Sequence, residues 1–527
     1  MSNVTKAMLL DETAQAIKAA INEGFSMVAD AIEDSESEEN AVVYGFHIDS
    51  TESDPGKAVT YLEDAAGMTP ARMNYLNDKF SYGSWIDAFF FPRPCMVRYD
   101  GTVDYYLDPD DYEKKENGEL SALGDSTLEY GVKYPGNAMM EWGRDGYKIW
   151  TKVVPDEEDV YSGSVYISNK KIDDDYTAWP FVNNQGNMVS HFYTAIYNGS
   201  MTAYTYDSST YYRLRSIPHR PVMNSPGNNS YDIPWDDDTE ATPTTWSSLT
   251  QAGHEVRFAL NNNTALNYTT SADFPTLSTN RNSIYWFTEV FCDIQLINNL
   301  LVLIGKSLNT QDVFGNGNMS GNGTTGYINN GVLFTGSDSY DSSGTPQYNI
   351  LNKAGLFWGS SGSKYAVKTF GMENWWGNQY RRYAGHISKS SSITSDYDHF
   401  IKNTFGTEDG STTIGYNTSG SGYIDTQVTI PASNNYITKS KFVNTITHSG
   451  VTYKIGTFLA SVTASSGSGS TFYSDYFYPN RSDTRYVCRG GHSSYGSLCG
   501  AFFVCAYYSV SFANWTLGAA LSFKPAA

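Results

Sequence analysis

The sequence predicts an α+β fold, built from an N-terminal helix, a small α+β module and a large domain with long loops. Apolar residues recur at helical spacing in residues 10–32 and again in residues 286–304. Between these stretches, short runs of aromatic and β-branched residues are bounded by Gly, Pro and Asp, as is typical of strands. A chain of 527 residues also exceeds one ordinary core, which favours two or three folded units.

The N-terminal helix is predicted from seven apolar residues at steps of three and four, which share one stripe of a helix. They are Leu10, Ala14, Ile17, Ile21, Phe25, Val28 and Ile32. An isolated helix of this length is marginal in water, so it must pack on something. Residues 1–35 are therefore expected to form either a short homo-oligomeric coiled coil or an amphipathic helix docked on its own domain. The acidic run 35–40 indicates a linker.

The small α+β module is predicted to span residues 41–131. Residues 42–46, 85–91 and 95–99 have strand composition. A helical patch is expected from Pro70 to about Leu76, because Pro suits the first helical position and Thr69 can cap it.

The large domain is predicted to span residues 132–527. Strands are expected at 147–150 and 165–167, and residues 286–304 are expected to form a core helix that ends at Gly305. Residues 309–345 and 465–470 are dominated by Gly, Asn, Ser and Thr, which predicts loops over a scaffold.

The charge balance restricts the possible partners. The chain has 56 acidic and 35 basic residues, for a formal net charge of -21, and such a surface repels phosphate backbones and anionic membranes. No apolar stretch reaches the roughly 18 residues that cross a bilayer, and the first residues do not resemble a secretion signal. We therefore expect neither nucleic-acid binding nor membrane insertion.

Tyrosine is unusually frequent, with 41 residues. Tyr, Ser, Gly and Asn recur on antigen-binding loops because Tyr gives a large contact area at a low entropy cost. The composition alone fits a binding surface and a generic exposed β protein equally well.

The residue types that carry catalytic or metal chemistry do not form a recognisable site. The five cysteines lack CxxC spacing, and the eight histidines lack a zinc-hydrolase pattern. The carboxylate runs 173–175 and 236–238 have the ligand type for calcium, but solvated turns are the simpler interpretation. Arg381 and Arg382 are expected to be a solvated pair or ion-pair partners of the acidic surface. We expect no metal and no cofactor.

Several segments resemble phage tail proteins that carry a C-type-lectin-like fold. They are residues 146–150, 165–170, 193–199 and 214–218, followed in the same order by the helix and by 303–311. Residues 370–378 are similar to the Gly-Asn-Val-Trp signature of the formylglycine-generating-enzyme branch of that fold, although Gln379-Tyr380 replaces its last pair. Residues 489–523 resemble the closing segment of variable proteins diversified by retroelements. The resemblance covers roughly residues 134–523.

This resemblance implies a fixed frame with variable side chains between its anchors, over about residues 488–523. The frame residues are Gly490, Gly491, Gly500, Phe502, Trp515 and Gly518, whose glycines suit tight turns or close backbone approach and whose aromatics suit anchors. The variable, receptor-contacting positions are His492, Ser493, Ser494, Tyr495, Phe503, Cys505, Tyr507, Tyr508, Phe512 and Thr516. The alternative is an ordinary strand and loop whose aromatic residues are buried.

The resemblance also implies a function. The chain is expected to be a homotrimeric adhesin of a phage tail tip or tail fibre, made in the host cytoplasm. It would bind other phage tail proteins at one end and a host bacterial surface protein or glycan at the other.

Two rival functions remain open. A tail-associated glycan-degrading enzyme would need two carboxylates that flank a cleft. A structural tail subunit would keep its end segment under contact with neighbouring subunits. The enzyme branch of the family oxidises with a cysteine pair, and Cys488, Cys499 and Cys505 lie in the corresponding part of the chain. A catalytic thiol needs an electropositive setting, so buried free cysteines are the better interpretation and no enzyme activity is expected.

Overall fold

The computed structural model describes residues 41–525 with several gaps. The gaps are residues 100, 184–185, 207–208, 221, 223–283, 321–331, 343–344, 390–396, 403–422, 431–433, 449–450, 480–484 and 509–515. The N-terminal helix predicted for residues 1–35 lies outside the described residues.

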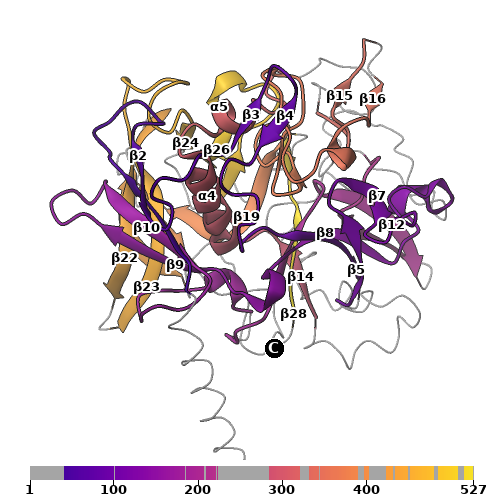
Figure 1. Cartoon of the computed structure of the whole chain (residues 1–527), viewed down its shortest axis with the longest axis horizontal. Helices are drawn as coiled ribbons and strands as arrows, with labels where there is room; N and C mark the ends of the chain where they lie inside the picture. The colour runs from indigo at the N-terminus through magenta and orange to yellow at the C-terminus, as the bar shows by residue number, and fades with distance from the viewer. Residues whose placement is uncertain are drawn as a thin grey trace, which may run out of the picture.

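The described part of the chain is mostly β, with α-helices only at α4 (Phe291–Gly305) and α5 (Thr310–Phe314) (Figure 1). The predicted class, α+β with a small α+β module and a C-type-lectin-like domain, is therefore wrong. Residues 70–76, expected to be helical, contain instead β3 (Arg72–Asn74), which pairs with β4 (Lys79–Ser81). Local helix signals are a weak prior, and strand pairing overrides them here.

A four-stranded antiparallel sheet has the order β2-β1-β10-β9. Its strands are β1 (Val43–Ile48), β2 (Val59–Glu63), β9 (Trp150–Pro155) and β10 (Gly163–Ser168). Phe46 in β1 lies opposite Val165 in β10 and Tyr61 in β2. Residues on both sides of the predicted boundary at 131 thus build the same sheet.

A seven-stranded sheet has the order β14-β28-β11-β8-β5-β6-β7. Its strands are β5 (Arg93–Arg98), β6 (Val103–Asp108), β7 (Asp111–Lys115), β8 (Gly136–Trp142), β11 (Phe192–Ala195), β14 (Ile284–Thr288) and β28 (Leu521–Pro525). The last strand of the chain, β28, lies between β11 and β14, so the C-terminal residues complete a sheet begun before residue 100.

A nine-stranded sheet has the order β21-β20-β19-β25-β26-β24-β22-β23, with β27 beside β19. Its strands are β19 (Tyr380–Lys389), β20 (Tyr397–Ile401), β21 (Ile424–Ile430), β22 (Asn435–His448), β23 (Val451–Thr463), β24 (Tyr476–Pro479), β25 (Arg485–Gly490), β26 (Gly500–Ala506) and β27 (Leu517–Gly518). Strand β26 pairs antiparallel with β25 and parallel with β24, which makes it an interior strand.

Short elements connect the sheets. Two-stranded pairs are β12 (Ser200–Tyr206) with β13 (Ser209–Arg215), β15 (Ser339–Tyr340) with β16 (Pro346–Gln347), and β17 (Lys368–Thr369) with β18 (Met372–Glu373). Single 3-10 turns are η1 (Ser126–Gly131), η2 (Arg144–Gly146), η3 (Trp179–Phe181), η7 (Leu351–Lys353) and η8 (Gly496–Leu498). Residues 85–91, expected to be a strand, form turns instead.

Helix α4 is the centre of the core. Figure 1 shows it between the hairpin β22–β23 and the four-stranded sheet on one side, and β8 and β14 on the other. The helix begins five residues later than predicted, because residues 284–288 form β14. It ends at Gly305, where the left-handed Lys306 (φ 48°) stops it.

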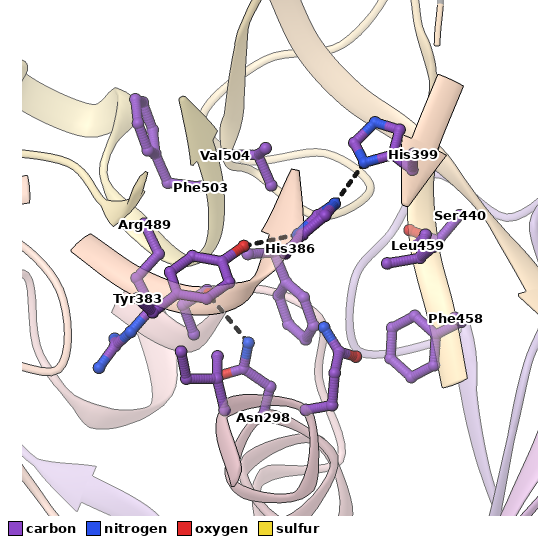
Figure 2. Close-up of a pocket in the computed structure, with 14 residues that line it drawn as sticks. Asn298, Tyr383, His386, His399, Ser440, Phe458, Leu459, Arg489, Phe503 and Val504 are labelled. Atoms are coloured by element: carbon purple, nitrogen blue, oxygen red, sulfur yellow. Dashed lines mark hydrogen bonds between the residues drawn. The ribbon is translucent and has the colours of Figure 1, made fainter. Parts of the chain in front are cut away.

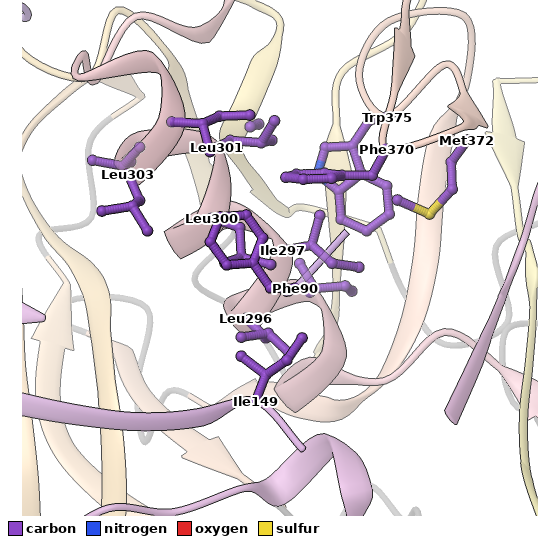
Figure 3. Close-up of a cluster of buried hydrophobic side chains, with 14 of the residues drawn as sticks. Phe90, Ile149, Leu296, Ile297, Leu300, Leu301, Leu303, Phe370, Met372 and Trp375 are labelled. Carbon is purple, nitrogen blue, oxygen red and sulfur yellow. The ribbon is translucent and has the colours of Figure 1, made fainter. Parts of the chain in front are cut away.

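Every residue of this helix except Gln295 is buried, as expected for a helix at the centre of a core. Leu296, Ile297 and Leu300 belong to one buried cluster with Ile149 and Trp375 (Figure 3). Segments from the first and last thirds of the chain meet in this cluster, so the described residues share one large core.

Candidate functional site

A row of tyrosine rings lies on the outer side of the C-terminal strands. We call it the tyrosine face and define it as Tyr436, Tyr476, Tyr478, Tyr495, Tyr507 and Tyr508. Neighbouring ring centroids are close: 5.4 Å for Tyr436 and Tyr476, 6.3 Å for Tyr476 and Tyr478, 5.2 Å for Tyr478 and Tyr507, and 5.4 Å for Tyr507 and Tyr508. Each ring is at least partly exposed, and Tyr507 is 44% exposed.

Tyr380 at the start of β19 supports this face from below. Its ring is buried and lies 5.5 Å from Tyr495, 5.7 Å from Tyr508, 5.5 Å from Phe503 and 4.8 Å from His492. Burial raises the pKa of the Tyr380 hydroxyl far above its usual range, so this tyrosine stays neutral. The exposed rings therefore rest on a packed aromatic base.

Two of these tyrosines lie on β24, where buried and partly exposed side chains alternate. Phe477 is fully buried, whereas its neighbours Tyr476 and Tyr478 are partly exposed. Side chains point to alternate faces of a strand, so the two tyrosines share the outer face. The sequence motifs do not indicate these two tyrosines, although the alternation Tyr476-Phe477-Tyr478 is present in the sequence.

The glycines of the predicted frame are packed too closely to accept a side chain. A Cβ at Gly500 would lie 1.8 Å from Asp475 Oδ1, and one at Gly491 (φ 77°) would lie 2.4 Å from Cys499 Sγ. The Asp475 carboxylate accepts a 2.6 Å hydrogen bond from the Phe502 backbone N–H. These contacts fix where β26 begins.

The other frame positions differ in how closely they are packed. Gly490 has a φ of 83°, and a Cβ at Gly518 would lie 2.5 Å from Gln379 Oε1. Phe502 is only half-buried, 5.1 Å from the Tyr473 ring, and Trp515 lies outside the described residues.

The predicted receptor-contacting positions divide into two groups. Ser494 and Tyr507 are exposed and Tyr495 and Tyr508 are partly exposed. In contrast, five of them are buried: His492, Ser493, Phe503, Cys505 and Thr516. Phe512 lies outside the described residues.

The buried group has a physical reason. Phe503 and Cys505 belong to a cluster with Tyr380, Cys488 and Leu517, which the partly exposed tyrosines cover. Phe503 and Cys505 alternate along β26 with the partly exposed Phe502 and Val504, so they share the face that this cluster covers. For these side chains the expectation of an exposed contact surface does not hold.

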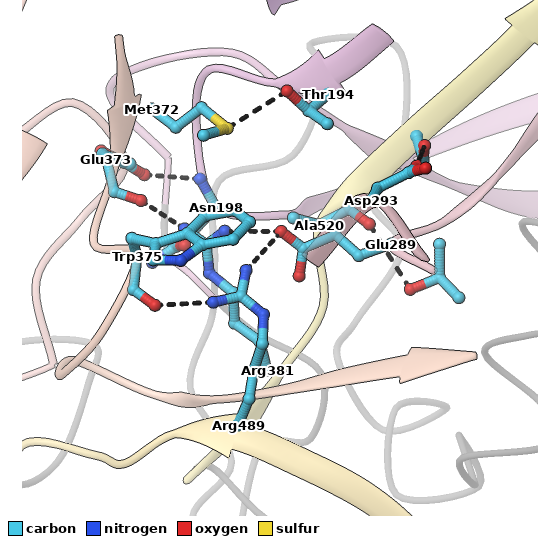
Figure 4. Close-up of polar contacts among 12 residues, drawn as sticks. Thr194, Asn198, Glu289, Asp293, Met372, Glu373, Trp375, Arg381, Arg489 and Ala520 are labelled. Atoms are coloured by element: carbon cyan, nitrogen blue, oxygen red, sulfur yellow. Dashed lines mark hydrogen bonds and ion pairs between the residues drawn. The ribbon is translucent and has the colours of Figure 1, made fainter. Parts of the chain in front are cut away.

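A buried ionic cluster lies beneath the sheet (Figure 4). Glu289 Oε1 is 2.8 Å from an Arg381 nitrogen and 2.7 Å from an Arg489 nitrogen, and all three side chains are 3% exposed. Arg489 also stacks 3.6 Å from the centre of the Trp375 ring and donates a 2.6 Å hydrogen bond to the Trp375 carbonyl. Burial lowers the pKa of Arg489 to about 10, so it remains charged.

This cluster corrects the interpretation of Arg381 and Arg382 as solvated residues, because both are buried. Arg381 also donates to the backbone carbonyl of Glu373, in segment 370–378. The Glu373 carboxylate accepts from two backbone N–H groups at 2.6 Å, and burial raises its pKa to about 7. Segment 370–378 therefore ties β19 and β25 to the core.

A small cavity of about 40 Å³ contains a chain of three polar side chains (Figure 2). The Tyr383 hydroxyl is 2.7 Å from His386 Nδ1, and His386 Nε2 contacts His399 Nδ1. Burial lowers the pKa of both histidines, that of His399 to about 3, so both rings are neutral. The cavity has room for ordered water but offers neither a carboxylate nor a reactive thiol.

The cysteines have the wrong environment for thiol chemistry. All five are buried and none is in a disulfide. Burial raises the pKa of Cys499 and Cys505 well above the usual range, the opposite of what a catalytic thiolate needs.

Two carboxylates of the acidic run 173–175 form ion pairs with lysines. An Asp173 carboxylate oxygen lies 2.7 Å from Lys152 Nζ, and an Asp174 carboxylate oxygen lies 2.7 Å from Lys171 Nζ. Run 236–238 lies outside the described residues. Within the described ranges, no group of three or more His, Cys, Asp or Glu side chains is arranged to hold a metal ion.

The sequence matches no family model, and comparison with curated proteins finds no significant relative. In the part of the chain that the structure covers, no helix has the length and apolarity needed to cross a membrane.

Proposed function

We propose that this chain is the receptor-binding adhesin of a bacteriophage tail and that the tyrosine face contacts the host cell. The contacting side chains are Tyr495, Tyr507, Tyr508 and Ser494, together with Tyr476 and Tyr478 of β24. The resemblance of residues 489–523 to retroelement-diversified variable proteins supports this assignment. The receptor is a surface protein or a glycan of the host bacterium.

The single observation that carries the proposal is the continuous row of partly exposed tyrosine rings on a rigid base. A tyrosine ring buries a large area with only two torsions to fix, and its hydroxyl can both donate and accept. The face is ordered before binding, because Asp475 and the close-packed Gly500 pin β26. Pre-organisation lowers the entropy cost of recognition.

The adhesin is proposed to act as a homotrimer attached to other tail proteins of the virion. Three faces on one tail tip raise the effective concentration of each site, so contacts of modest affinity are sufficient on a crowded cell surface. A trimer in solution by light scattering is the expected result, and a monomer at micromolar concentration would contradict this part of the proposal.

Cell binding tests the proposed function. The fluorescently labelled full chain is incubated with a panel of bacterial strains, and strains that retain it are identified by flow cytometry. The variants Tyr507→Ala and Ser494→Arg should lose most of this retention, because each changes the exposed face without changing the core. The matched control is Tyr365→Ala, which removes a ring of similar exposure, 39%, from a loop outside the face. Equal retention by all variants would exclude the tyrosine face as the contact surface.

The diversification that the resemblance implies has its own test. A near-copy of the codons for residues 488–523, beside a reverse-transcriptase gene in the source genome, is the expected finding. Related isolates should then differ at positions 494, 495, 507 and 508 more than at the glycines of the frame.

A further inference from the structure

A concave surface is lined by residues of β9, the segment 171–188, β21 and the hairpin β22–β23. We call it the aromatic groove and define it by Trp150, Tyr176, Trp179, Tyr453, Asp174 and Lys454. Its volume is about 450 Å³, within the size range of sites that hold small ligands.

The groove is well separated from the tyrosine face. Tyr453 pairs with Ile446 near the turn of the hairpin, whereas Ile437, next to Tyr436 of the tyrosine face, pairs with Thr463 at the far end. Ten residues of strand separate positions 436 and 446, which corresponds to roughly 30 Å. The two surfaces are therefore separate.

The walls of the groove are held by backbone pairing. Thr151 and Thr177 exchange two backbone hydrogen bonds of 2.8 and 2.9 Å, which fix Tyr176 and Trp179 beside Trp150. On the other side, the hairpin approaches so closely that a Cβ at Gly456 (φ 59°) would lie 3.2 Å from Thr177 Oγ1. The aromatic rings are thus positioned before any ligand arrives.

The rim of the groove adds charged groups of both signs to these rings. Lys171 and Asp174 form a 2.7 Å ion pair at the rim, and Lys454 lies beside them. The hydrogen bond and charge of Lys171, together with the charge of Lys454, lower the pKa of Asp174, which is therefore ionised at neutral pH. The rim offers ammonium donors and a carboxylate acceptor within one small area.

These features select among ligand classes. A pyranose has an apolar face of C–H groups that packs on aromatic rings, and hydroxyls that both donate and accept hydrogen bonds. Lys152, Lys171 and Lys454 balance the three carboxylates of residues 173–175, so this area has no net charge and favours neither a cationic nor a strongly anionic ligand. We propose that the aromatic groove binds a neutral pyranose unit of a glycan.

This site goes beyond the proposed receptor contact, since it uses different residues and does not depend on diversification of residues 488–523. A pyranose site near one end of the hairpin and a tyrosine face at the other would let the chain contact two points of a polysaccharide-coated surface.

Saturation-transfer NMR on the full chain tests the proposal directly. The probes are the methyl pyranosides of glucose, galactose, mannose and N-acetylglucosamine at millimolar concentration. At least one should show saturation transfer, and Tyr453→Ala should weaken its binding by at least about tenfold. Lys454→Ala, on the partly exposed rim, should also weaken it and serves as the second variant if Tyr453→Ala fails to fold. Tyr365→Ala is the matched control and should bind as the wild type does.

Three results would overturn the proposal: no transfer to any of the four pyranosides, equal transfer in the wild type and in both groove variants, or binding of indole or tetramethylammonium in place of every sugar. The readout is independent of cell retention by Tyr507→Ala, so the groove and the tyrosine face can fail separately.

Discussion

The two faces of strand β26 differ in how deeply their side chains are buried, and therefore in how well they accept substitutions. On the outer side, Phe503 and Cys505 are fully buried under the partly exposed tyrosines. On the inner side, Phe502 and Val504 line the small histidine cavity and are only partly buried. The fully buried side is fixed by its packing, and freedom to vary belongs to the partly exposed rings that cover it. A contact surface that changes must be carried by a base that does not.

The buried ionic cluster should give the largest loss of stability. Arg489→Met leaves the Glu289 carboxylate with one of its two arginines, and removing a partner from a buried pair costs about 3–5 kcal/mol. The free energy of unfolding from urea titration measures this loss. Arg93→Met is the control, because the Arg93–Glu116 pair is 38% and 42% exposed and an exposed pair contributes about 0–1 kcal/mol. Equal losses in both variants would mean that the cluster does not hold the sheet.

The aromatic base should give the next largest effect. Phe503→Ala removes a fully buried ring and should lower the free energy of unfolding by about 3 kcal/mol. Tyr507→Ala, from the exposed layer, should change it by no more than about 0.5 kcal/mol. Chemical denaturation of the two variants compares the stability contributed by the buried Phe503 ring with that contributed by the exposed Tyr507 ring. A small loss in Phe503→Ala would show that β26 is less tightly packed than its burial indicates.

The close approach at Gly500 should have a somewhat smaller effect. Gly500→Ala places a methyl group where Asp475 Oδ1 now lies, and overpacking of this kind costs about 2 kcal/mol. Gly56→Ala is the matched control, since its Cβ would meet its nearest neighbour at an ordinary 3.6 Å. Thermal unfolding followed by circular dichroism compares the two. Similar melting temperatures in the two variants would contradict the inference that the close contact of Gly500 with Asp475 fixes the tyrosine face.

Acid should weaken the core through the histidine pair. The pKa of His399 is lowered by burial to about 3, below its ordinary value of 6.5, so the unfolded chain binds more protons between these values. The contribution of the neutral His399 to the free energy of unfolding is fully present above pH 6.5 and is lost as the pH falls. Between pH 6.5 and 5 the loss is about 2 kcal/mol.

The raised pKa of Glu373 acts in the opposite direction, because its protonation favours the folded state. The comparison is therefore between the wild type and His399→Gln, in urea titrations at both pH values. The wild type should lose more stability on acidification than the variant. Parallel losses would mean that His399 does not titrate on unfolding.

Part of the fold was predictable from local pattern. Helical spacing predicted the buried helix, and Gly305 marked its end, because these signals lie in consecutive residues. The start of α4 was predicted too early, since Trp286 fits both a helical stripe and the strand β14 that pairs with β28 from the other end of the chain. Pairing across more than 200 residues leaves no local signature, which is why the α+β class was wrong.

The site was predictable only in outline. The run Ala501 to Ala506 is apolar at every position, and a continuous apolar run is typical of a strand buried on both sides. That signal opposed the assignment of Phe503 and Cys505 to a contact surface. Tyr476 and Tyr478 join the face only through the parallel pairing of β24 with β26, which no spacing in the sequence indicates. The aromatic groove likewise combines segments that lie more than 200 residues apart.

Tyrosine-selective labelling on cells tests most directly whether the tyrosine face is the contact surface. The full chain is labelled alone and when bound to a strain that retains it, and modified residues are quantified by mass spectrometry. Tyr507, Tyr508 and Tyr478 should be protected on the cells, whereas the exposed Tyr147 and Tyr365 should be labelled equally in both states. Labelling of Tyr507 that does not change on binding would contradict the assignment of the receptor contact to this face.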